Sequence, residues 1–268
     1  MSELVFLKLG GSLITDKRSS ETARPAVISR VGQEIAAALR ARPDLRLVLG
    51  HGSGSYGHVV AAKYQVRKGH LTNWLGYAET SAAAQRLNRL VTDRLLAEGV
   101  PATALQPSAS ARCADGELEH LATEPVTELL QHRVVPLVYG DVALDTARGC
   151  TIISTEQIFC YLARALQPQR IIMVGEVAGV FTGDPQREAI VRLVPEISRA
   201  NYAQVEHMLS SSFGVDVTGG MLDKVRTLYQ LVCEQPALTV RIITGRRAEL
   251  VRDVLLDPSL QEGTLLRY

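Results

Sequence analysis

Glycine-rich segments and lysines carry the chemistry that this sequence can support. The chain opens with a short apolar run, Leu4 to Leu7, which leads into Lys8, two glycines and Ser12. Such a run is typical of a buried strand. Glycines let backbone N–H groups approach an anion closely, and a lysine adds a mobile positive charge. We therefore predict a phosphate site where this first strand ends, with Lys17 a few residues beyond it.

A second glycine-rich segment, Gly52 to Gly57, matches the G-x-G-x-x-G pattern of dinucleotide-binding turns. It follows the second strand rather than the first, and no acidic residue ends a following strand, so a nicotinamide site is disfavoured. A turn that holds a phosphate fits better. His58 follows directly. From the residues alone, it is equally well a structural histidine or a side chain that donates a hydrogen bond to phosphate. Later, Gly219 and Gly220 precede a helix whose first turn carries Lys224, which favours an anion role.

Composition excludes several classes of function. The 29 Lys and Arg balance 28 Asp and Glu, and aromatic residues make up only 5% of the 268 residues. This balance argues against a nucleic-acid-binding protein. No apolar run reaches membrane-spanning length, and the first residues lack a signal-peptide pattern. The four cysteines are widely spaced and do not form a metal motif, so we expect free thiols in a reducing cytoplasm.

Apolar strand-like runs alternate with helical stretches along the chain. We expect strands at 4–9, 45–49, 134–138, 170–174, 238–244 and 263–267, helices from 25 and at 79–98, 155–166 and 221–234, and a hairpin at 142–153. This alternation predicts an α/β fold, a three-layer αβα sandwich with a central, mostly parallel sheet. Ligands bind such sheets beyond the carboxyl ends of the strands, where the glycine clusters fall. We expect one domain, 1–268, with two lobes that divide near residues 166–169.

Four segments in order resemble the amino acid kinase superfamily: 8–12, 52–57, 177–185 and 218–224. Within it, Lys17, the Ser55-Tyr56-Gly57-His58 run and the 218–224 segment resemble the isopentenyl phosphate kinase family. The resemblance spans nearly the whole chain. It implies transfer of the γ-phosphoryl group of ATP to isopentenyl phosphate, with Mg²⁺ bridging phosphate oxygens. It further implies a homodimer with a helix of the acceptor lobe at its interface, an acceptor lobe over about 1–167 and a nucleotide lobe over about 168–268.

The resemblance also implies roles for individual residues. The catalytic residues would be Lys8, Lys17, His58 and Lys224. The acceptor would lie against Gly52, Gly57, His58 and Gly140. The nucleotide would lie against Lys8, Gly10, Gly11, Ser12, Ser53, Glu176, Phe181, Asp184, Gly219 and Lys224. No side chain is expected to bind a metal directly. An isoprenoid tail needs an apolar pocket, for which the candidates are Val59, Ala62, Tyr77 and Ile153.

The sequence departs from the family pattern at the residues before the 155–166 helix. Ser154, Thr155 and Glu156 stand where relatives often carry a Ser-Gly-Asp-Asp-like run, whose first acid orients the catalytic lysines. Glu156 could replace that acid with a longer reach, and Asp145 is a second candidate. The glycine turn also carries Ser53, where relatives often have another glycine.

Two other functions stay open from the residues. A kinase of the fosfomycin type would use the same lysines and histidine, because a phosphonate resembles a phosphate monoester. A nucleotide-binding storage or regulatory protein could share the fold without catalysis.

Overall fold

The computed structural model describes residues 2–16, 18–183, 191–212 and 220–268, apart from the side chains of His58, Ser211 and Ser212. Its centre is an eight-stranded sheet in the order β10-β12-β11-β9-β1-β2-β6-β3. Among the strand pairs of this sheet in the described residues, only β11–β12 is antiparallel, so the mostly parallel sheet is confirmed. The strands are β1 (Leu4–Leu9), β2 (Arg46–His51), β3 (Ala102–Ala104), β6 (Val135–Tyr139), β9 (Arg170–Gly175), β10 (Glu196–Ile197), β11 (Thr239–Thr244) and β12 (Thr264–Leu266).

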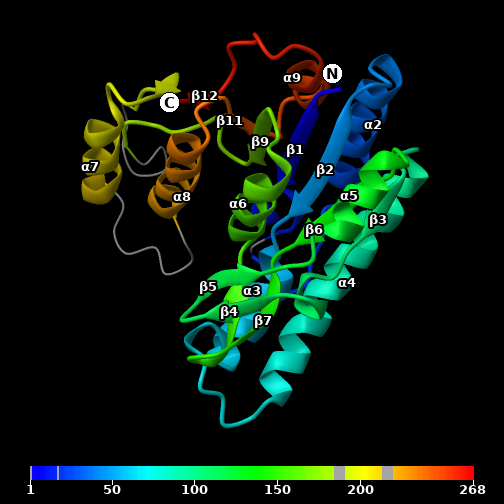
Figure 1. Ribbon diagram of the computed structural model, residues 1–268, viewed down its shortest axis with the longest axis vertical. Helices are drawn as coiled ribbons and strands as arrows, with labels where there is room; N and C mark the ends of the chain where they lie inside the picture. The colour runs from blue at the N-terminus through cyan, green and yellow to red at the C-terminus, as the bar shows by residue number, and fades with distance from the viewer. Residues whose placement is uncertain (1, 17, 184–190, 213–219) are drawn as a thin grey trace.

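Helices cover both faces of this sheet, which confirms the three-layer sandwich (Figure 1). Side chains alternate across β1 because successive residues of a strand point to opposite faces. Phe6 packs on Phe159 of the one layer, with ring centroids 5.1 Å apart, and Val5 and Leu7 join the core of the other layer. The first layer contains α5 (Glu124–Gln131), α6 (Thr155–Leu166) and α8 (Met221–Glu234), with α7 (Tyr202–Ser212) beside α8. The second contains α2 (Pro25–Ala41), α4 (Leu75–Ala97) and α9 (Leu250–Leu256).

A smaller four-stranded sheet, in the order β5-β4-β7-β8, flanks one end of the sandwich (Figure 1). β7 (Asp141–Asp145) and β8 (Gly149–Ile153) form the hairpin expected at 142–153. β4 (Arg112–Ala114) and β5 (Glu117–His120) were not predicted, because runs of three and four residues give no clear alternation. Gly140 is the single residue between β6 and β7, so the small sheet begins at the carboxyl edge of the large one.

Two short helices start at the same carboxyl edge. α1 (Gly11–Ile14) follows β1, and α3 (Gly54–Lys63) follows β2. The 3₁₀ turns η1 (Val66–Lys68) and η2 (Pro107–Ala109) lie in the connections around the small sheet. No helix in the described part of the chain is both long and apolar enough to cross a membrane.

Candidate active site

The glycine turns after β1 and β2 touch each other. The Gly52 N–H donates to the Leu9 carbonyl at 3.0 Å. A Cβ atom on Gly52 would lie 2.8 Å from the Gly11 nitrogen, and one on Gly11 would lie 2.7 Å from the Gly54 Cα. Gly54 also has a φ of +50°, in the left-handed region that favours glycine. Only residues without side chains allow the two turns to approach this closely.

The two turns present hydrogen-bond donors without partners. Within the described residues, the backbone N–H groups of Gly11, Ser12, Ser53 and Gly54 have no acceptor. They lie at the first residues of α1 and α3, where helix geometry leaves N–H groups unpaired. Such groups at helix N-termini bind anions. The paired turns can therefore hold phosphate oxygens.

Two lysines meet one carboxylate beside these turns. Lys8, near the end of β1, is 7% exposed and forms an ion pair with Glu156 Oε1. The Lys224 ammonium, in the first turn of α8, lies 3.9 Å from the same oxygen. A capping box fixes Glu156 in the first turn of α6: Ser154 Oγ accepts from the Gln157 N–H at 3.1 Å, and Gln157 Oε1 accepts from the Ser154 N–H at 2.9 Å.

The charges of this cluster follow from burial and pairing. Burial opposes ionisation of Glu156, but Lys8 and Lys224 outweigh it and lower the pKa of the carboxyl to about 2. Burial and the neighbouring Lys224 lower the pKa of Lys8, while the Glu156 charge acts in the opposite direction. An ionised carboxylate thus lies against the two lysines at the edge of the glycine turns.

Asp145, the other candidate for orienting the lysines, has a different set of partners. Its carboxylate accepts from the backbone N–H groups of Asp115 and Gly116, at 3.2 and 2.7 Å, and of Ala147 and Arg148, at 2.9 and 2.8 Å. Burial raises its pKa, but these hydrogen bonds prevail and lower it. Asp145 therefore closes turns of the small sheet, and the residue that contacts the lysines is Glu156.

A small cavity of about 50 Å³ lies between the glycine turn, α4 and the small sheet. Ser53 Oγ donates to the Gly140 carbonyl at 2.9 Å on one side of it. Its lining comprises Ser53, Gly57, Ala61, Thr80, Ala84, Gly140, Asp141 and Ile152. Of the residues expected at the acceptor, Gly57 and Gly140 line this cavity, and Gly52 lies in the adjoining turn.

The four tail-pocket candidates do not line the cavity. Ile152 lines it in place of Ile153, because adjacent strand residues face opposite sides and Ile153 enters the core under α6. On α3 the lining residue is Ala61 rather than Ala62, and Val59 is 51% exposed. Tyr77 packs beside Val66 and Cys150 under the small sheet.

The residues expected on the nucleotide side spread over several elements. Gly10, Gly11 and Ser12 lie at the first turn. The Glu176 carboxylate, after β9, is held by Arg24 at 2.6 Å and by Arg246 at 2.7 Å. Phe181 is half-buried and pairs with Leu193 in an isolated β-bridge. Lys17, Asp184, Gly219 and the His58 side chain lie outside the described part, although the His58 backbone belongs to α3.

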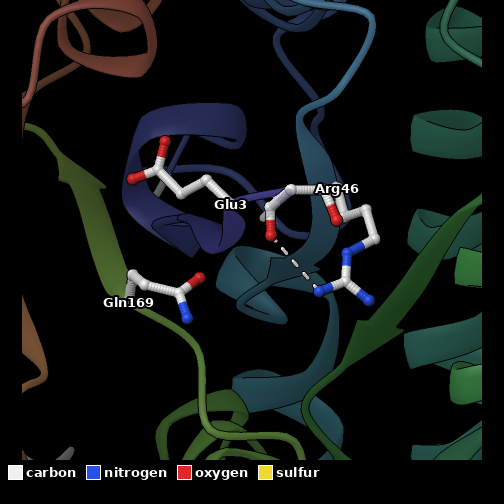
Figure 2. Close-up of a pocket in the computed structure, with 4 residues that line it drawn as sticks. Glu3, Arg46 and Gln169 are labelled. Carbon is white, nitrogen blue, oxygen red and sulfur yellow. Dashed lines mark hydrogen bonds between the residues drawn. The ribbon is translucent and has the colours of Figure 1, made fainter.

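Another hollow lies at the opposite edge of the sheet and does not contact the glycine turns. Figure 2 shows Glu3, Arg46 and Gln169 around it, at the amino-terminal ends of β1, β2 and β9. Ligands of parallel sheets bind at the carboxyl ends of the strands. The edge with the glycine turns is therefore the candidate site.

The sequence analysis missed two buried polar residues next to this site. His51 ends β2 immediately before the glycine turn and is fully buried. Asp141 lines the small cavity, and burial raises the pKa of its carboxyl although Ser108 and Val142 donate to it. His51 precedes Gly52 of the glycine-rich motif, and Asp141 follows Gly140, which the family resemblance placed at the acceptor; these neighbours are the signal that could have found them.

A parallel sheet whose glycine turns and paired lysines gather at one edge defines a phosphotransferase of the amino acid kinase class. The model of the amino acid kinase family matches residues 3–243 of this chain. A solved structure described as an isopentenyl phosphate kinase matches with a TM-score of 0.84 and 31% identity, covering 98% of this chain and 100% of that one.

Curated relatives narrow the class further. The isopentenyl phosphate kinase of Methanothermobacter thermautotrophicus is 35% identical over 85% of this chain and 86% of its own length. That of Methanocaldococcus jannaschii is 31% identical over 99% of each chain. The chain belongs to the isopentenyl phosphate kinase family.

Proposed function

We propose that this protein transfers the γ-phosphoryl group of ATP to isopentenyl phosphate, giving isopentenyl diphosphate and ADP. The observation that carries the proposal is the Lys8–Glu156–Lys224 cluster beside the unpaired N–H groups of the two glycine turns. The kinship with isopentenyl phosphate kinases supplies the acceptor. The Glu156 carboxylate lies against two lysines next to N–H groups that can bind an anion. This arrangement suits a reaction in which two negatively charged phosphates must approach each other.

The chain's own groups account for the chemistry such a transfer needs. Phosphoryl transfer depends on in-line positioning and on neutralising negative charge rather than on covalent catalysis. The N–H groups of Gly11, Ser12 and Ser53 would hold phosphate oxygens, and Lys8 and Lys224 would offset the charge of the transferred group. Because the acceptor is itself a phosphate anion, the reaction needs no strong general base.

On the acceptor side, we propose that His58 binds the phosphate of isopentenyl phosphate, together with Gly52, Gly57 and Gly140. The position of the His58 backbone on α3, one residue after Gly57, supports this role. The small cavity lined by Ala61, Ala84 and Ile152 would receive the five-carbon tail.

On the nucleotide side, we propose Lys8, Gly10, Gly11, Ser12, Ser53, Glu176, Phe181, Asp184, Gly219 and Lys224, with Lys17 as a further catalytic lysine. The contact between glycine turns, which a single Cβ would block, supports a fit to ATP phosphates. In the described residues no three Asp, Glu, His or Cys side chains gather as a metal site. We propose that Mg²⁺ is held by phosphate oxygens and water, where it supplies positive charge.

At the level of the whole protein, we propose an acceptor lobe over about 1–167, a nucleotide lobe over about 168–268 and a cytoplasmic homodimer. All four cysteines are free, which suits a reducing compartment.

Trp74 and Leu75, at the start of α4, are about half exposed and support an interface near that helix. A single protomer in sedimentation equilibrium at micromolar concentration would refute the dimer.

A coupled ADP-release assay tests the reaction. We expect rapid turnover with Mg·ATP and isopentenyl phosphate, and background rates with fosfomycin, glutamate or no acceptor. The matched control is Lys8→Ala, which should lose at least ~10²-fold in kcat/KM because a transition-state donor is removed. Equal turnover on fosfomycin, or none on any acceptor, would contradict the proposed function.

A further inference from the structure

The ring of His51 is buried between the second glycine turn and α4. Its Nδ1 lies 3.1 Å from the Gly52 carbonyl oxygen, and its Nε2 lies 3.1 Å from Asn88 Nδ2. The ring stacks on Tyr139 with centroids 5.5 Å apart and planes 8° from parallel. Both ring nitrogens therefore have partners, and neither partner is a substrate group.

These contacts select one tautomer of the ring. An amide nitrogen only donates hydrogen bonds, so Nε2 must accept from Asn88 and the proton resides on Nδ1. Nδ1–H then donates to the Gly52 carbonyl. Burial, opposed by this bond and reinforced by the Lys8 charge, lowers the pKa of His51 to about 4. The ring is thus neutral at physiological pH and holds the glycine turn by a single donated hydrogen bond.

That hydrogen bond fixes the direction of a neighbouring N–H group. In a trans peptide the C=O and N–H point in opposite directions. The Gly52 carbonyl and the Ser53 N–H belong to the same peptide group. The hydrogen bond from the His51 ring to this carbonyl therefore sets the direction of the Ser53 N–H, which has no acceptor among the described residues. A glycine turn by itself restrains this peptide weakly.

The backbone of His51 connects the second glycine turn to the residues that hold the lysine cluster. Its carbonyl accepts from Thr155 Oγ1 at 2.6 Å and from the Gly140 N–H at 3.3 Å. Thr155 precedes Glu156, the residue that contacts both lysines. His51 thus links the glycine turn, the start of α6 and the edge of the small cavity.

We propose that His51, held by Asn88 in its Nδ1–H tautomer, is a positioning residue that aims the Ser53 N–H at the phosphate oxygens during transfer. This inference rests on the proposed kinase reaction. A donor whose direction is set before substrates bind requires no rearrangement in the transition state, where it stabilises charge most.

Variants of His51 separate positioning from packing. His51→Leu removes the donor and should lower kcat by ~10²-fold, with the KM for ATP changing by less than about threefold. His51→Asn can still donate a hydrogen bond from its amide nitrogen. Its kcat should therefore be about tenfold higher than that of His51→Leu. Thr92→Val is the matched control: it removes the 2.8 Å bond from Thr92 Oγ1 to the Asn88 carbonyl and leaves both partners of the ring in place. This control should keep the wild-type kcat.

Asn88→Asp tests the tautomer itself. A carboxylate at position 88 accepts a hydrogen bond from Nε2–H. In a neutral ring, the Nδ1 lone pair would then face the Gly52 carbonyl oxygen, and that hydrogen bond would be lost. Only a protonated ring could donate both to the carboxylate and to the Gly52 carbonyl. The kcat of this variant should therefore fall as pH rises through the pKa of its His51. Lys8 on β1 and Tyr139 on β6 are the titratable groups that face the ring. Both are also present in the wild type, so the comparison of the two profiles removes their contribution.

The outcomes distinguish this inference from the proposed function. Wild-type kcat in His51→Leu, a loss of melting temperature without a loss of kcat, or identical pH profiles for Asn88→Asp and wild type would each overturn the role of His51. A wild-type chain that does not phosphorylate isopentenyl phosphate would refute the proposed function instead. In that case a ¹⁵N spectrum of the ring still decides the inference, since a proton on Nε2 overturns it and a proton on Nδ1 supports it.

Discussion

Glu156 differs from the acid that the family resemblance predicts, and its carboxylate contacts both Lys8 and Lys224. The resemblance predicts a shorter acid at this point, and the sequence analysis left Glu156 and Asp145 as alternatives. The capping box at the start of α6 places Glu156 in the first helical turn, where a carboxylate is stabilised by the helix dipole. One oxygen of its carboxylate contacts Lys8 and lies 3.9 Å from the Lys224 ammonium.

Substitutions of Glu156 should separate the effect of its charge on activity from the effect of its size. Glu156→Gln keeps the size but removes the charge that raises the pKa of Lys8, so that pKa should fall further. We expect kcat/KM to drop by ~10²-fold and its alkaline decline to begin at lower pH than in the wild type. Glu156→Asp retains the charge and should be intermediate. Full kcat/KM profiles against pH measure both effects, and an unshifted alkaline limb in Glu156→Gln would argue against this role.

At the scale of elements, the small sheet is tied together by one side chain. Asp145 ends β7 and accepts four backbone N–H groups from the β4–β5 and β7–β8 turns. Two turns that are 30 residues apart in sequence thereby share one acceptor. The hairpin around β7 and β8 was predictable from its alternation and glycine, whereas the β4–β5 pair depends on contacts that no local pattern encodes.

Asp145→Ala should therefore destabilise the fold without disabling the chemistry. Loss of the charged acceptor leaves several backbone donors unpaired, and we expect the free energy of unfolding to fall by roughly 3 kcal/mol. The kcat of the folded variant should stay within about threefold of wild type, unlike that of Glu156→Gln. Urea unfolding and steady-state kinetics on the same preparation measure both quantities. A large loss of kcat at unchanged stability would instead place Asp145 in the catalytic machinery.

At the scale of the whole molecule, one ion network joins Glu3, near the N-terminus, to β9 and α9 at the amino-terminal edge of the sheet. Arg170 donates to Glu3 at 2.5 and 3.0 Å and to the carbonyls of Val254 and Leu255 at the end of α9. Arg42, at the end of α2, donates to the same carboxylate at 2.9 Å. With the β1–β9 pairing, this network connects the two proposed lobes on the side away from the glycine turns.

This network should make stability depend on acid pH. Burial opposes ionisation of Glu3, but Arg170 and Arg42 prevail and lower its pKa below the ordinary 4.5. Stability from Glu3 is therefore present above pH 4.5 and is lost as pH falls through the lower, folded-state pKa. Glu3→Gln should lose roughly 2 kcal/mol of unfolding free energy at pH 7, and its deficit should shrink as the pH falls. Urea titrations at several pH values test this, and a deficit that does not change with pH would contradict it.

The sequence by itself determined most of the strands and helices of the sandwich and the positions of the glycine turns, but not β10, α7 or α9. Apolar runs and helical periodicity are local, and glycine is required wherever two turns come into contact, so these features are visible in one dimension. Lys8 and Lys224 were identified by their places next to such turns. The resemblance in four ordered segments pointed to the family.

Only the tertiary structure decided which side chains meet. Glu156 and not Asp145 reaches the lysines, Ile152 and not Ile153 faces the small cavity, and His51 and Asn88, which are 37 residues apart, share a hydrogen bond. These choices depend on the register of strands and on the direction of each side chain across packed layers. Neither is fixed by composition or spacing, because a shift of one residue reverses the face of a strand.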